Sequence, residues 1–133
     1  MNIDELGHRA AACKHWRWMP GMYAEPLAFR VVWADDDSIG EADQISYLRE
    51  RVPHIYPDLS DPATLGCLLA LVREAWPKGE ATTNIHANYS PERGHYREWT
   101  CYYCTGSDWR QTHASTEAEA LVAALKAAPK VTP

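Results

Sequence analysis

Apolar side chains recur at intervals of three and four residues in two long segments, which predicts two amphipathic helices. The first helix follows Asp61, a good N-cap residue, and Pro77 stops it. The second follows Thr116, which has Glu119 at capping-box spacing, and Pro129 ends it. Their apolar stripes consist of Leu65, Leu68, Leu69, Val72 and Trp76 in the first helix, and of Ala118, Leu121, Val122, Leu125 and Ala128 in the second.

Between these helices the hydrophobic period shortens to two residues, which predicts strands. Polar and apolar residues alternate over Thr82 to Tyr89 and over His95 to Cys104, and Ser90 to Gly94 is a hairpin loop. A turn then leads into a short third strand over Trp109 to His113. Leu27 to Trp33 alternates in the same way, so we expect it to extend the antiparallel meander to a fourth strand.

The remaining segments add two helices and a loop. One helix is expected over Ile3 to Cys13, with acidic residues in its first turn, and a short one over Ala42 to Arg51. Val52 to Ser60 holds two prolines and is expected to be a loop. The pattern predicts the α+β class, with a meander of three to four strands packed against two long helices.

Composition and charge narrow the classes of function. The chain has 133 residues, the length of one domain, in which residues 1–56 precede a helix, meander and helix over 57–128. No apolar run approaches the ~20 residues of a membrane helix, and Met1 to Glu5 carries acids where a signal peptide has basic residues. We therefore expect a cytoplasmic protein with reduced cysteines. The net charge of −5 argues against a nucleic acid or an anionic membrane as the direct ligand.

The order of elements also resembles a known family. The stretch from Pro57 to Thr64, the helix after it, a strand pair rich in Trp and Cys, and a closing helix from Thr116 resemble small phage and prophage proteins described by the phage ABA sandwich domain, over residues 57–128. The segment Trp16 to Met22 is similar to one near the start of other prophage proteins. This resemblance implies a phage-encoded origin and a fold, and it carries no catalytic residues.

Two segments are candidates for binding a partner protein. One is an acidic loop that would suit a basic surface, although short runs of like charge commonly serve only as a solvated loop. It consists of Asp35, Asp36, Asp37, Glu41 and Asp43. The other contains Trp16 and Trp18, whose indoles could grip a groove on a partner. Alternation along the chain places both indoles on the same side, which favours a role in the core.

The polar face of the meander is a candidate site for a small ligand or nucleotide. We expect this face to carry Arg30, Asn84, His86, Asn88, Glu98, Thr100 and Tyr102. The ligand-binding candidates are Asn84, His86, Asn88, Tyr102 and Arg110, which combine amide, imidazole, phenol and guanidinium groups. A sheet face in contact with water explains the same row equally well. The sequence has no Gly-x-Ser-x-Gly, no Gly-rich phosphate loop and no His-Glu-x-x-His, so we expect no enzymatic activity and no cofactor.

Cys101 and Cys104 have the Cys-x-x-Cys spacing with which many zinc sites begin, and His95 and His113 could complete four ligands. Residues three apart on a regular strand point to opposite faces, so the two sulfurs would diverge. A redox role would need the first cysteine at the start of a helix, whereas a turn into a strand follows this pair. Buried thiols are therefore the expected interpretation, and a zinc-stabilised domain is the alternative.

These observations favour one hypothesis about the function of the protein. It is a non-enzymatic phage or prophage accessory protein that acts by protein–protein contact in the host bacterial cytoplasm, with inhibition of a host defence or nucleic-acid-handling complex as its sharpest version. Six Trp and seven Tyr support it, because interfaces favour these residues. A homodimer is also expected, since a meander leaves an open edge strand. The alternatives are a small-ligand or nucleotide binder and the zinc-stabilised domain.

Overall fold

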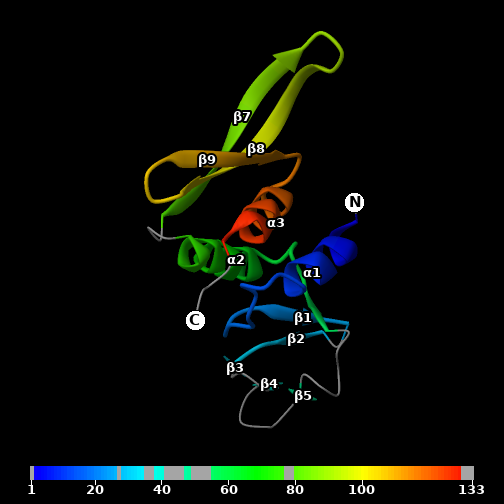
Figure 1. Ribbon diagram of the computed structural model, residues 1–133. Helices are drawn as coiled ribbons and strands as arrows, with labels where there is room; N and C mark the ends of the chain where they lie inside the picture. The colour runs from blue at the N-terminus through cyan, green and yellow to red at the C-terminus, as the bar shows by residue number, and fades with distance from the viewer. Residues whose placement is uncertain are drawn as a thin grey trace. The chain divides into compact units, whose positions relative to one another are not determined.

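The chain combines helices with antiparallel sheets, so the predicted α+β class is confirmed (Figure 1). The structure is a computed structural model, and it describes residues 2–26, 28–34, 38–40, 47–48, 55–76 and 80–129. These residues contain three helices and three three-stranded sheets. The chain divides into two compact units, residues 1–68 and 69–133, and the boundary falls within helix α2 (Pro62–Ala75).

Helix α1 (Ile3–Ala11) lies in the first unit and packs against strand β6 (Tyr56–Pro57). The Asn2 side chain caps it by accepting a hydrogen bond from the Glu5 backbone N–H at 2.7 Å. A glycine is required at position 7, because a Cβ atom there would lie 2.5 Å from the carbonyl oxygen of Pro57. The helix was predicted to reach Cys13 and ends two residues earlier.

Two small sheets complete the first unit. In one, β1 (Tyr23–Glu25) lies between β2 (Phe29–Arg30) and β6, and in the other the order is β3 (Trp33–Ala34), β4 (Ser38–Gly40) and β5 (Tyr47–Leu48). The prediction of one strand over Leu27 to Trp33 that extends the meander is therefore wrong. The segment pairs instead with strands close to it in the sequence: β2 pairs with β1, and β3 pairs with β4.

Two other predictions fail in the middle of the chain. Tyr47–Leu48 is a strand that pairs with Ser38–Ile39, where a helix over Ala42 to Arg51 was expected. The rest of that expected helix lies outside the described residues. The expected loop over Val52 to Ser60 contains β6, which is held by pairing with β1. Pairs of only two residues leave too short an alternation to be recognised in a sequence.

The second unit contains the predicted three-stranded meander, with strands β7 (Ala81–Ser90), β8 (Gly94–Cys104) and β9 (Trp109–Ala114). The register of β7 on β8 runs without interruption from Ala81 opposite Tyr103 to Ser90 opposite Gly94. Strand β9 pairs only with residues 99–104 of β8. Strands β7 and β8 therefore continue beyond β9 as a two-stranded ribbon over residues 86–98 (Figure 1). We call this ribbon, together with Ile85 at its base opposite Trp99, the arm.

Helix α3 (Glu117–Ala127) packs against β8 and β9, and Leu121 and Leu125 are buried there. Thr116 caps the helix as predicted, with its hydroxyl 3.2 Å from the Glu119 backbone nitrogen. Trp76, which directly follows the last residue of α2, stacks its ring on Tyr103 of the same sheet at 4.2 Å between centroids. The expectation that two long helices cover the meander is not matched, because α2 continues back into the first unit.

Candidate functional site

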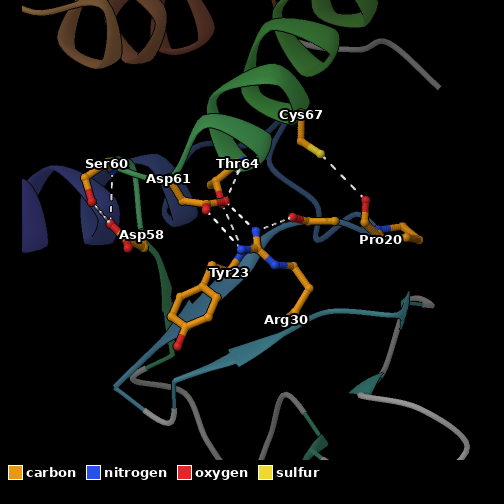
Figure 2. A network of polar contacts seen from close by, with 9 residues as sticks. Pro20, Tyr23, Arg30, Asp58, Ser60, Asp61, Thr64 and Cys67 are labelled. Carbon is orange, nitrogen blue, oxygen red and sulfur yellow. Dashed lines mark hydrogen bonds and ion pairs between the residues drawn. The ribbon is translucent and has the colours of Figure 1, made fainter.

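A connected group of polar side chains in the first unit surrounds the start of helix α2 (Figure 2). The Asp61 carboxylate accepts hydrogen bonds from the Thr64 backbone N–H and from the Thr64 hydroxyl, at 3.0 and 2.9 Å. Arg30 donates to both oxygens of the same carboxylate, at 2.5 and 3.0 Å. It also donates to the carbonyl of Gly21 at 2.9 Å. The Thr64 hydroxyl oxygen in turn accepts from the Tyr23 backbone N–H at 2.9 Å.

This network fastens β1 and β2 to the first turn of α2. The hydrogen bonds from Arg30 hold the pKa of the Asp61 carboxyl below its usual value, and those from Thr64 act in the same direction. Both carboxylate oxygens of Asp61 have partners within the chain, and Oδ2 accepts three of the four hydrogen bonds. The geometry of the network is that of a structural cap.

Trp16 and Trp18 belong to the core of the first unit. Each indole is only 8% exposed, and the two rings meet edge to face with 5.6 Å between centroids. Burial leaves little of either indole for contact with a partner. The alternative from the sequence, a role in the core, agrees with this placement. The Trp16 Nε1–H is buried without a hydrogen-bond partner among the described residues.

The acidic loop cannot be placed in the same way. Asp35, Asp36, Asp37, Glu41 and Asp43 lie outside the described residues. Its role in binding a basic partner stays a prediction.

The polar face of the meander brings several predicted site residues together. The Tyr102 hydroxyl lies 3.1 Å from Nε2 of His86, and Nδ1 of His113 lies 3.0 Å from Glu98 and 3.1 Å from the Thr100 hydroxyl. In the register, Thr100 lies on β8 between Glu98 and Tyr102. The contact between His86 and Tyr102 therefore spans Thr100, which is only 1% exposed.

This arrangement does not form a nucleophile with a base. In a catalytic triad the imidazole uses one nitrogen for the nucleophile and the other for the carboxylate. Here Thr100 and Glu98 share Nδ1 of His113, which cannot donate to one and accept from the other at once. The Thr100 hydroxyl is also buried, so a substrate could not reach it. The polar groups satisfy one another and stabilise this face of the sheet.

Two residues predicted for this face lie elsewhere. Arg110 is paired with Tyr103, so it lies on the α3 side of the sheet, opposite the face of Asn84, His86, Asn88 and Tyr102. Its position in a short, weakly alternating strand gave the sequence no means of fixing its face. Arg30 lies in the first unit on β2, where it binds Asp61.

The proposed zinc ligands are not brought together. Cys101 and Cys104 lie on opposite faces of β8, as their spacing indicated. His95 is paired with Tyr89 in the arm, while His113 is paired with Thr100. Among the residues that the structure describes, no three metal-ligating side chains form a group. Burial raises the pKa of the Cys101 thiol to about 11, which disfavours the thiolate that a metal or a redox reaction needs.

The arm carries two of the exposed large hydrophobic side chains of the second unit. Ile85 and Tyr89 share one of its faces and are 45% and 65% exposed. The Tyr89 ring on β7 lies 5.1 Å from the ring of His95, its partner on β8, and the guanidinium of Arg93 in the hairpin turn lies 3.8 Å from the Tyr96 ring centroid. These contacts order the surface of the arm without burying it. The sequence predicted the hairpin and missed that it extends beyond the third strand, a length difference visible only once the register is known.

The described helices include none long and apolar enough to cross a membrane. Comparisons with protein families, with curated proteins and with solved structures find no match for this chain. The phage origin that the resemblance implies therefore stays a prediction.

Proposed function

We propose that this protein is a non-enzymatic binding protein that contacts a partner protein through the arm. The observation that carries this proposal is the ordered arm, which holds Ile85 and Tyr89 in solvent. A two-stranded ribbon without a core is only marginally stable in water, so a long one has a cost in stability. Large exposed apolar and aromatic side chains are also the residues that interfaces use.

The charges of the arm favour a protein over a nucleic acid. Arg93 and Arg97 are balanced by Glu92 and Glu98. Binding to a phosphate backbone depends on a surplus of Lys and Arg, which this ribbon lacks. The contact of Arg93 with Tyr96 gives the arm instead the mixture of aromatic and guanidinium groups that is frequent at protein interfaces.

The test compares capture of partners by purified wild-type and variant chains. The double variant Ile85→Ser, Tyr89→Ser removes the exposed apolar groups of the arm and should lose a partner that the wild type retains. Trp109→Ser is the matched control, because Trp109 is an exposed aromatic residue (54%) on β9, outside the arm. A partner retained by the double variant, or lost equally in the control, would contradict the proposal. Thermal unfolding of all three chains verifies that they fold.

A further inference from the structure

The outer edge of β7 has free backbone hydrogen-bonding groups. The Cys104 backbone N–H donates to the Glu80 carbonyl at 3.2 Å, and these residues continue the register of β7 on β8. Hydrogen-bonded pairs alternate in an antiparallel ladder, so even-numbered residues of β7 bond to β8 and the odd-numbered ones point their backbone groups outward. Ala81 fits this pattern, because its carbonyl accepts from Arg73 Nε at 2.9 Å.

Beyond Ala81 this edge has no strand partner among the described residues. The outward backbone groups of Thr83, Ile85, Ala87 and Tyr89 bond to no described residue. Native edge strands are protected from pairing by charged residues, prolines, bulges or short length. Strand β7 has ten residues, no bulge in its register, and neither a charged residue nor a proline. The opposite edge strand, β9, has six residues and carries Arg110.

We infer that β7 pairs antiparallel with β7 of a second copy of this chain, which joins two meanders into one six-stranded sheet. An uncharged strand can pair with itself because no like charges are brought together. A two-fold axis through His86 gives every free position a partner: Thr83 lies opposite Tyr89 of the second copy, and Ile85 lies opposite Ala87. On the other face, Asn84 lies opposite Asn88, so amide faces amide. This symmetry is isologous and closes at two copies.

The inference rests on the proposed function in that both place the binding surface on the arm. They use different parts of it, however. Edge pairing uses the backbone of β7, while the exposed faces of the arm stay accessible to another protein. The two proposals can therefore fail separately.

The test measures the mass of the full chain in solution by light scattering over a range of concentrations. The wild type should have twice the mass of one chain and dissociate on dilution. Ala87→Pro removes an outward N–H without breaking a bond between β7 and β8, and it should weaken the dimer by at least about 100-fold. Gln111→Pro is the matched control: by the same alternation its N–H points outward from β9, so it should leave the dimer unchanged.

A second variant guards against misfolding of the proline chain. Ala87→Lys places a charge in the middle of the edge at an exposed position, and it should also give a monomer. A monomeric wild type, or a dimer that both Ala87 variants leave intact, would overturn the inference. A monomer that still captures a partner through Ile85 and Tyr89 would overturn the second copy alone and leave the proposed function standing. A dimer that captures no partner through Ile85 and Tyr89 would overturn the proposed function and leave the pairing of β7 standing.

Discussion

At the scale of single residues, Asp61 has two separable roles. Its carboxylate caps α2 through Thr64 and pairs with Arg30. The cap could be predicted, because Asp61 immediately precedes a proline and an apolar period. The pair with Arg30 could not, since the two residues are 31 positions apart and their meeting depends on how β2 folds against α2. The sequence therefore predicted the local capping role of Asp61 but not its long-range ion pair with Arg30.

Substitutions at Asp61 should separate these roles. Asp61→Asn keeps a capping oxygen and loses the charge, so it should destabilise the protein less than Asp61→Ala, which loses the cap as well and costs about 1 kcal/mol more. Arg30 lowers the pKa of Asp61 in the folded state, so the charged carboxylate stabilises the fold above the unfolded pKa of about 3.9. That contribution disappears as the pH falls through the lower folded pKa.

The measurement is the free energy of unfolding by urea from neutral pH down to about pH 2. The difference between wild type and Asp61→Asn should be constant at neutral pH, shrink below about pH 4 and vanish at the acid end. A difference that persists unchanged in acid would mean that the ion pair with Arg30 is not its source.

At the scale of elements, close packing reverses the usual effect on stability of replacing a helix glycine by alanine. Replacing a glycine inside a helix by alanine ordinarily stabilises it by about 1 kcal/mol. In α1 an added Cβ at Gly7 would lie 2.5 Å from a backbone oxygen of β6, so Gly7→Ala should destabilise the protein instead. Gly66 in α2 has nothing within 4 Å of the same position, so Gly66→Ala should stabilise it by about 0.5–1 kcal/mol.

Chemical unfolding of the two variants beside the wild type measures both signs. If both variants were stabilised, α1 would not approach β6 as closely as the structure places it. If Gly66→Ala were destabilising, the space around that position would be occupied. The pair is informative because the two substitutions are chemically identical and differ only in what the new methyl group meets.

The same scale explains which elements were predictable. Three elements have a hydrophobic pattern that continues over many residues and a clear cap or turn, and all three are present. They are the helices after Asp61 and Thr116 and the hairpin of β7 and β8. Strands β1, β2 and β6 pair over only two or three residues, so their order arises from tertiary contacts with α1 and with each other. The residues of the candidate site were predictable to the same extent as the elements that carry them. His86 and Tyr102 meet because the long register is regular, while the face of Arg110 was misplaced.

At the scale of the whole molecule, the charge is unevenly distributed along the chain. Residues 1–68 contain six Lys and Arg against eleven Asp and Glu, whereas residues 69–133 contain seven of each. The net charge of −5 therefore belongs entirely to the first unit, and the unit that carries the arm is neutral. Binding through the acidic loop would weaken strongly with salt, whereas binding through the apolar groups of the neutral arm would depend on salt much less.

Salt also tests the pairing of β7 in the self-association of the chain. Pairing of β7 edges involves no ion pair, and two copies that each carry −5 repel one another. Raising the salt from about 50 mM to about 500 mM screens that repulsion, so the dissociation constant of the dimer should stay the same or fall. Analytical ultracentrifugation at both concentrations measures it. A dissociation constant that rises tenfold would assign the contact to charged groups and contradict the pairing of β7, because an uncharged edge has no attraction for salt to screen.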